Sequence, residues 1–182
     1  MQYSRLGDTG LIVSRLAFGA MTFGTGKGPF AAVSKVGPEL ANQIIGKTLD
    51  AGINFFNTAD GYTGGQSEEI LGKALGVRRK DVVVSTKVGF RSGEPLLHQG
   101  LSRQHILASA EGSLRRLGTD YIDVYLVHRV DVNTPVEETA GALDDLVRQG
   151  KVRYAGFSNW PAWMATKAIG IQRARGWTQF RA

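Results

Sequence analysis

The chain has 182 residues, 42% hydrophobic and 21% charged, which suits one globular domain with a sizeable core. It contains no cysteine, which excludes disulfides and thiolate metal sites and fits a cytoplasmic protein. The net charge of +6 favours anionic partners. We expect no nucleic-acid or membrane partner, because no nucleic-acid-binding motif or apolar run of about 18 residues is visible.

The first part of the chain predicts a hairpin, a strand and a loop. Turn residues separate two short extended segments, 2–6 and 10–13, as in a β-hairpin. An apolar strand is expected at 14–19. The following segment, 24–37, is rich in Gly, Ala, Ser and Lys, which is typical of a mobile loop.

A helix is expected to begin at Pro38, where the missing proline N–H costs nothing, and to end at Gly52. The apolar residues on its expected buried face are Leu40, Ile44, Ile45 and Leu49. Ser67 is placed to cap the next helix. Another helix should begin near Ser102, and residues 134–137 form a capping-box pattern that begins a fourth.

Strands are expected between these helices. Their positions are 53–56, 81–87, 121–128 and 152–157, and a last helix follows at about 161–176. The run at 81–87 is β-branched without strict alternation, which suits burial on both faces of a parallel sheet. Alternating strands and helices predict an α/β fold with a parallel sheet. A complete (β/α)8 barrel needs about 250 residues, so the pattern fits either an open sheet or a barrel cut short near its sixth strand.

Polar residues follow the central strands where each strand ends: Asn57 and Tyr62, Lys87, His128, and Ser158 with Asn159. The carboxyl ends of parallel strands share one edge, where catalytic groups gather. A lysine ammonium near Tyr62 is expected to lower the tyrosine pKa from its usual value of about 10. Tyr62 would then donate a proton to a developing alkoxide, and His128 would orient a carbonyl group.

Each of these residues also has an ordinary structural alternative. Lys87 suits a solvated strand end, and His128 suits a hydrogen bond to a neighbouring loop. Ser158 and Asn159 are both good helix caps. Polar residues at four successive strand ends favour the functional interpretation over four separate structural ones.

Four blocks of sequence carry a family resemblance: GINFFNTADGY with SEEILG at 52–72, VSTKVG at 84–89, LRRLGTDYIDVYLVH at 114–128 and GKVRYAGFSN at 150–159. The chain resembles the aldo-keto reductases, of the bacterial type related to potassium-channel β subunits. The resemblance implies a (β/α)8 TIM-barrel fold with an N-terminal hairpin at its base. On that basis residues 1–182 form one such domain, truncated after about five and a half βα units.

The resemblance also implies roles for single residues. Tyr62 matches the family's proton donor, Lys87 the lysine that lowers its pKa, and His128 the histidine that orients the substrate carbonyl. The family's fourth catalytic residue is an aspartate, and Asn57 stands at its position. An asparagine still accepts a hydrogen bond from Lys87 but carries no charge, so we expect weakened rather than abolished activity. Asp60 lies close enough in sequence to compensate.

The implied cofactor is NADPH and the implied substrate a small-molecule carbonyl compound. Ser158 and Asn159 match residues that hold the nicotinamide carboxamide. Ala20 and Met21 match a segment that lies against the cofactor. The family's later strands, with a further glutamine and the residues that bind the 2′-phosphate, have no counterpart here, so NADPH-versus-NADH preference and the particular substrate stay open. No metal is implied.

Two further functional hypotheses stand beside carbonyl reduction. A half-barrel with little or no activity would serve as an interaction module, with a homo-oligomer covering the open barrel edge. An unrelated barrel enzyme would share only the fold, because fold alone does not fix chemistry. Binding and turnover measurements discriminate among the three.

Overall fold

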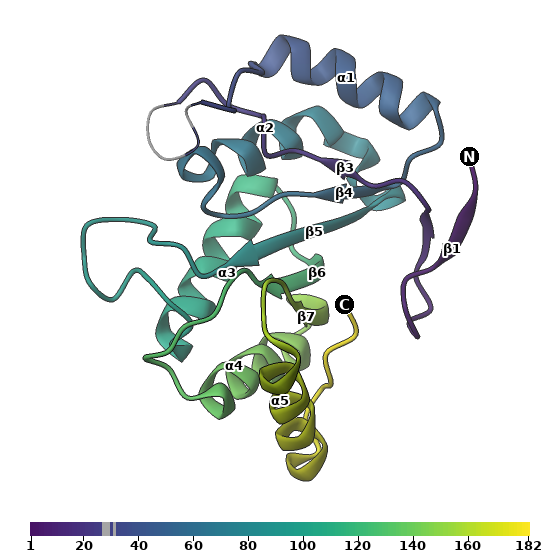
Figure 1. Ribbon diagram of the computed structural model, residues 1–182. Coiled ribbons are helices and arrows are strands. Elements are labelled where there is room, and N and C mark those ends of the chain that lie inside the picture. The colour runs from purple at the N-terminus through teal and green to yellow at the C-terminus, as the bar shows by residue number, and fades with distance from the viewer. Residues whose placement is uncertain (27–29, 31) are drawn as a thin grey trace.

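The computed structural model describes residues 1–26, 30 and 32–182 (Figure 1). An antiparallel hairpin of β1 (Tyr3–Arg5) and β2 (Ile12–Ser14) precedes a five-stranded parallel sheet. The sheet strands, in both chain order and spatial order, are β3 (Phe18–Gly19), β4 (Phe55–Asn57), β5 (Val83–Val88), β6 (Ile122–Val127) and β7 (Val152–Phe157). The predicted α/β fold with an N-terminal hairpin and a parallel sheet is therefore confirmed.

Helices alternate with the strands and pack against one another in chain order along the outside of the sheet (Figure 1). They are α1 (Pro38–Asp50), α2 (Gln66–Leu75), α3 (Arg103–Leu117), α4 (Val136–Arg148) and α5 (Ala162–Arg175). Short 3-10 helices, η1 (Tyr62–Gly65) and η2 (Gly76–Asp81), flank α2. Sequential parallel strands with an outer layer of helices are the arrangement of a partial (β/α)8 barrel. Among the described residues, no helix is long and apolar enough to cross a membrane.

The residues after α5 lie against β7, where a sixth strand would add to the sheet. The Arg181 N–H donates to the Ala155 carbonyl over 2.9 Å, and the Phe157 N–H donates to the Ala182 carbonyl over 3.0 Å. The loop expected at 24–37 includes residues 27–29 and 31, which lie outside the described residues.

Alternate residues of the strands face two different cores. Phe56 and Val84 face the helices, where they pack with Leu71 and Leu75 of α2. On the other face Val83 and Val124 contact Val13 of the hairpin, with Leu6 and Leu11 packed nearby. The Ser14 N–H donates to Asn54 Oδ1 over 2.7 Å, which fixes the hairpin beneath the amino ends of the strands. The hairpin does not cover the opposite edge of the sheet, where the strands end and the loops begin.

The buried face of α1 differs in part from the prediction. Leu40 is 49% exposed, and the buried positions of α1 are Ala41, Ile45 and Thr48. These three residues follow a four-three spacing that leaves Leu40 about 100° away around the helix. The helix begins at Pro38 as predicted and ends at Asp50, two residues before Gly52. Of the predicted buried face, Ile45 is buried and Leu49 packs against the core, whereas Leu40 is exposed.

Two predicted helix caps are wrong. Ser67 lies inside α2 rather than at its start, and its hydroxyl group donates to the Ala20 carbonyl over 2.6 Å. Thr134 makes no capping bond to α4 and instead donates to Asp131 Oδ2 over 2.7 Å. For Ser67 a tertiary partner replaces the local one, whereas Thr134 bonds to a carboxylate three residues before it. Ser102, by contrast, caps α3 as expected by accepting from the His105 N–H over 3.3 Å.

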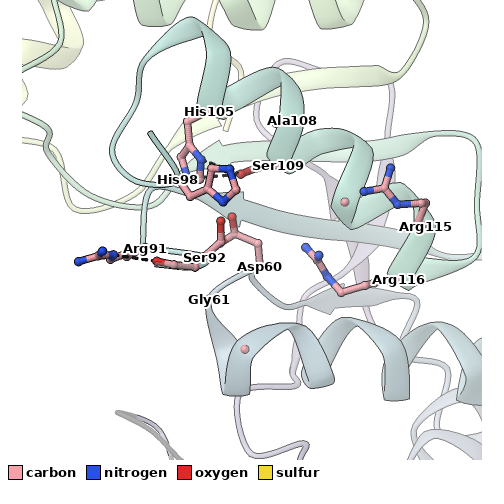
Figure 2. A pocket seen from close by; sticks show the side chains of 13 residues that line it. Asp60, Gly61, Arg91, Ser92, His98, His105, Ala108, Ser109, Arg115 and Arg116 are labelled. Atoms are coloured by element: carbon pink, nitrogen blue, oxygen red, sulfur yellow. Dashed lines mark hydrogen bonds between the residues drawn. The ribbon is translucent and has the colours of Figure 1, made fainter. Parts of the chain in front are cut away.

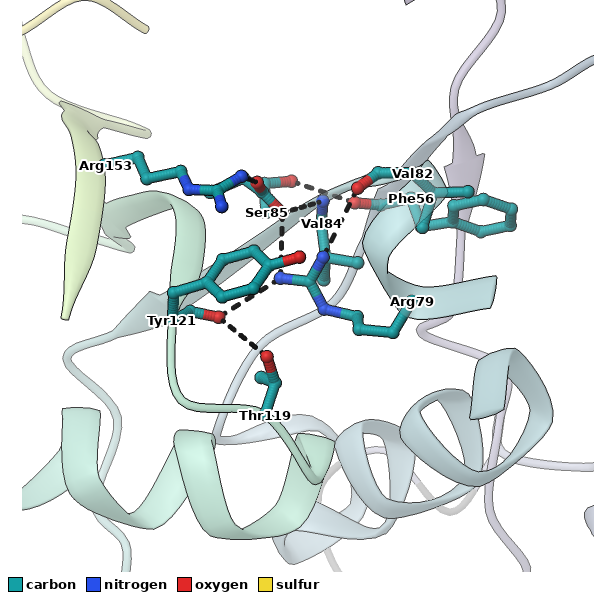
Figure 3. Close-up of polar contacts among 9 residues, drawn as sticks. Phe56, Arg79, Val82, Val84, Ser85, Thr119, Tyr121 and Arg153 are labelled. Carbon is teal, nitrogen blue, oxygen red and sulfur yellow. Dashed lines mark hydrogen bonds and ion pairs between the residues drawn. The ribbon is translucent and has the colours of Figure 1, made fainter. Parts of the chain in front are cut away.

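A buried ionic cluster joins β5 and β6 near their amino ends (Figure 3). Asp123, whose side chain is 1% exposed, pairs with Arg79 and with Arg153 at 2.8 Å each. It also accepts from the Val84 N–H over 3.0 Å. The two guanidinium groups lie over the Tyr121 ring, 4.5 and 3.7 Å from its centroid. Asp123 is therefore satisfied on both oxygens by charged or backbone donors.

Candidate active site

The predicted residues meet at the carboxyl edge because strand register puts them on one face. Asn57 ends β4 and pairs with Ser85 of β5, and Lys87 lies two residues further along the same strand. Side chains two residues apart in a strand point to the same side. His128 directly follows β6, and Ser158 directly follows β7. The structure thus brings together side chains that are up to 101 residues apart (158 − 57).

Lys87 is the centre of a hydrogen-bonded group. Its ammonium donates to Asn57 Oδ1 over 2.7 Å, to the Thr58 carbonyl over 2.8 Å and to the Tyr62 hydroxyl over 3.3 Å. Asn57 in turn donates from Nδ2 to Ser85 Oγ over 2.7 Å, which fixes the orientation of the amide. The predicted contact between Asn57 and Lys87 is therefore present.

Burial controls the charge of this lysine. It lowers the pKa of Lys87 to about 8, and the carboxylates of Asp60 and Glu68 oppose that shift. A neutral asparagine at position 57 contributes no charge against the desolvation of the ammonium. At pH 7 the ammonium form still predominates, which keeps a proton next to the Tyr62 hydroxyl.

Tyr62 is buried at the start of η1, and burial raises its pKa. The prediction that Lys87 lowers this pKa is therefore wrong for the protein without ligands. Lys87 makes its two short bonds to Asn57 and Thr58, and its bond to the Tyr62 hydroxyl is the longest of the three. The neutral phenol is consequently the stable form, which is the form that a proton donor needs.

His128 is kept neutral. Burial, reinforced by the positive charges of Lys87 and Arg129, lowers the pKa of His128 to about 4. Its ring packs edge-on against Tyr62, with the ring centroids 5.5 Å apart. A neutral imidazole retains one N–H donor, so it orients a polar group without carrying charge into the site.

Two phenylalanines that the sequence did not single out enclose these rings. Phe90 packs edge-on against His128 at 4.7 Å, and Phe30 packs edge-on against Tyr62 at 5.3 Å. Phe30 and Phe90 also contact each other at 6.0 Å. Phe30 lies in the loop after β3, and Phe90 lies in the loop after β5. A position after a strand, at the carboxyl edge, is the one signal that would have identified them. The result is an apolar wall beside a polar proton-transfer group.

Asp60 has an environment that the sequence did not indicate. It is only 4% exposed, and neither carboxylate oxygen makes a hydrogen bond of normal geometry with a described residue. Burial and the charge of Glu68 raise the pKa of Asp60 to about 7, although Arg116, the Gly61 N–H and Ser109 lower it. Its side chain points toward Ser109 on α3 (Figure 2). Asp60 therefore affects Lys87 only through its charge.

The four candidate cofactor residues differ in accessibility. Ala20 is fully buried, and its N–H donates to the Asn57 carbonyl over 2.8 Å, whereas Met21 is 39% exposed. Asn159 is exposed and has a left-handed backbone with φ of 56°. Its Nδ2 donates to the His128 carbonyl over 2.9 Å and to Ser158 Oγ over 2.8 Å. Asn159 and Ser158 are thus held beside the catalytic edge, while Ala20 has a packing role.

A partial (β/α)8 barrel with a lysine–tyrosine pair and a neutral histidine at its carboxyl edge defines a class of barrel-type oxidoreductases. The chain belongs to the aldo/keto reductase family, whose family model matches residues 15–180.

Curated relatives agree with this assignment. The chain is 44% identical over 175 residues to a probable voltage-gated potassium channel subunit beta of Oryza sativa subsp. japonica, covering 94% of this chain and 50% of that protein. It is 42% identical over 174 residues to a protein of the same description from Arabidopsis thaliana, covering 93% and 50%. Versiconal hemiacetal acetate reductase of Aspergillus parasiticus is 38% identical over 200 residues, covering 99% and 57%. The chain therefore spans about half the length of the curated relatives it matches.

Proposed function

We propose that this chain carries the catalytic residues of an NADPH-dependent reductase that converts small aldehydes or ketones to alcohols. The observation that carries the proposal is the hydrogen bond from the Lys87 ammonium to the Tyr62 hydroxyl beside neutral His128. The similarity to versiconal hemiacetal acetate reductase supports the same chemistry. Carbonyl reduction needs one hydride and one proton, and the Tyr62 group is suited to supply the proton.

The residues at the end of β7 fit a nicotinamide carboxamide. No described residue donates to Asn159 Oδ1, so this oxygen is available to accept an N–H from a ligand. The strained φ of Asn159 costs of order 1 kcal/mol and is typical of residues held for function. Asn159, Ser158 and the exposed Met21 would hold the nicotinamide end of NADPH. When bound, NADPH supplies the hydride.

The proton step follows from the contacts of Tyr62. As negative charge develops on the carbonyl oxygen, the Tyr62 hydroxyl transfers its proton to that oxygen and becomes a phenolate. The adjacent Lys87 ammonium stabilises the phenolate, and Asn57 and the Thr58 carbonyl hold the ammonium in place. The neutral His128 ring donates its N–H to the carbonyl oxygen and orients it. The products are the alcohol, oxidised cofactor and a phenolate that regains its proton from solvent.

The cofactor and reaction are tested together. We expect NADPH to quench protein fluorescence on titration and to be oxidised in the presence of a model aromatic aldehyde, because Phe30 and Phe90 provide an apolar wall. Measurable NADPH binding without turnover would support the cofactor site but not the reduction of a carbonyl group. Neither binding nor turnover would contradict the proposal.

Assembly with other chains is a second candidate function. Two of the relatives are described as channel subunits, so they act within an assembly. A homo-oligomer that covers the barrel edge stays a prediction, as does a cytoplasmic location. Light scattering of the purified chain at several concentrations tests self-association independently of NADPH binding.

A further inference from the structure

A cavity of about 470 Å³ lies beside Asp60 and Gly61 (Figure 2). Its walls come from residues 60–64, from helix α3 and from the loop after β5. Tyr62, Lys87 and His128 are not among the residues that line it, so it is separate from the catalytic group. Its volume is in the usual range for small-molecule sites.

One wall presents the buried carboxylate of Asp60. Figure 2 shows this carboxylate directed into the cavity toward His105 and Ser109. Neither of its oxygens has a hydrogen-bond partner of normal geometry among the described residues. A buried polar group without a partner is unfavourable, so a ligand that donates a hydrogen bond here would gain affinity.

The opposite wall is positively charged. Arg115 and Arg116 are consecutive on α3 and both line the cavity. Arg116 is partly neutralised by Glu68, 2.7 Å from its Nε, whereas Arg115 makes no hydrogen bond with a described side chain or carbonyl. Gly112 leaves room for this arrangement, because a Cβ there would lie 2.9 Å from Arg116 Nη1. Arginine side chains on this wall favour a phosphate or carboxylate group as the ligand.

We propose that this cavity binds a small phosphate ester that carries hydroxyl groups. The phosphate would contact Arg115 and Arg116, and a hydroxyl group would donate to Asp60. A hydroxyl suits Asp60 better than an ammonium does, because it donates to the ionised carboxylate and accepts from the protonated one. With a pKa near 7, Asp60 is present in both forms at neutral pH.

Three probes with the same phosphate test the proposal by calorimetry at pH 7: glycerol 3-phosphate, propyl phosphate and phosphoethanolamine. They present hydroxyl, methyl and ammonium groups to Asp60. We expect glycerol 3-phosphate to bind about tenfold more tightly than propyl phosphate, the effect of one hydrogen bond to a charged group. Equal affinity for the three probes, tighter binding of phosphoethanolamine, or no binding would overturn the proposal.

Two variants locate the site. Arg115→Gln should weaken glycerol 3-phosphate binding about tenfold through loss of a charge-assisted hydrogen bond. Arg173→Gln, an exposed arginine on α5, is the matched control and should leave the affinity unchanged. Asp60→Asn should reduce the preference for glycerol 3-phosphate over propyl phosphate. Equal losses in Arg115→Gln and Arg173→Gln would show nonspecific attraction and sink the idea. Because the readout is binding, its failure is separate from failure of the reductase proposal.

Discussion

Lys87 donates to the amide oxygen of Asn57 over 2.7 Å. Asn57 therefore holds the lysine by a hydrogen bond without supplying a negative charge. Burial lowers the pKa of Lys87 to about 8, so a charge added beside this lysine would change its ammonium fraction at mildly alkaline pH. Substitutions of Asn57 are therefore an informative test of the site.

Asn57→Asp should raise the pKa of Lys87 above about 8, because a carboxylate 2.7 Å from Nζ stabilises the ammonium. The alkaline limb of the pH–rate profile should move to higher pH, and the rate at pH 8 should rise by up to about twofold. Asn57→Ala, which removes the hydrogen bond as well, is the matched comparison and should lower the rate. An unchanged pH profile in Asn57→Asp would show that Lys87 does not control the reaction.

Asp60→Asn tests the buried carboxylate through stability. The folded-state pKa of Asp60 is about 7, above its usual 3.8, so the folded protein binds more protons than the unfolded chain between these values. The stabilising contribution is complete below pH 4 and is lost as pH rises through 7. The variant should therefore gain stability relative to the parent by up to about 1 kcal/mol per pH unit in this window.

Urea unfolding at pH 5, 6, 7 and 8 measures that difference. Asp120→Asn, at an exposed position, is the control and should give a difference that does not change with pH. A flat difference for Asp60→Asn as well would mean that the Asp60 carboxyl group is solvated in the folded protein.

Asp123→Ala should destabilise the fold by about 3–5 kcal/mol, because it leaves the guanidinium of Arg79 buried without its partner. Arg153→Ala removes the other, half-exposed partner of Asp123 and should cost about 1 kcal/mol or less. Denaturant unfolding of both variants checks the contrast. Similar losses in the two would argue against a dominant Asp123–Arg79 pair.

Gly72→Ala tests the contact between α2 and α3. A Cβ at Gly72 would lie 2.5 Å from the Leu117 carbonyl oxygen, so the helices would have to separate, at about 1–3 kcal/mol. Gly46→Ala in α1 meets nothing within 4 Å and should stabilise by about 0.5–1 kcal/mol. Thermal melts of the two variants should therefore shift in opposite directions, and a shift in the same direction would refute the packing argument.

Much of the fold could be predicted because strands and helices here have clear local signals. The β-branched run that became β5 and the glycines after α3 and α5 are examples. The errors arise where another partner competes with the helix end: Ser67 bonds to the distant Ala20 carbonyl, and Thr134 bonds to Asp131 in the preceding loop. Sequence patterns carry no information about such partners.

Some features of the candidate site could likewise be predicted from the sequence, and others could not. Strand ends predicted that Asn57, Lys87 and His128 would meet, and the Asn57–Lys87 hydrogen bond was expected from their chemistry. The direction of the Tyr62 pKa could not be predicted, because it depends on how deeply the ring is buried. The wall formed by Phe30 and Phe90 depends on loop conformation, and loops lack a periodic signal.

Tyr62→Phe tests the central claim most directly, because it keeps the buried ring and removes only the hydroxyl group that Lys87 contacts. The rate of NADPH-dependent aldehyde reduction should be measured for parent and variant at pH 7, together with NADPH affinity. We predict a loss of about 10²–10⁴-fold in kcat with nearly unchanged NADPH affinity, as expected for removal of a general acid. A variant that keeps the parent rate would contradict the assignment of Tyr62 as the proton donor.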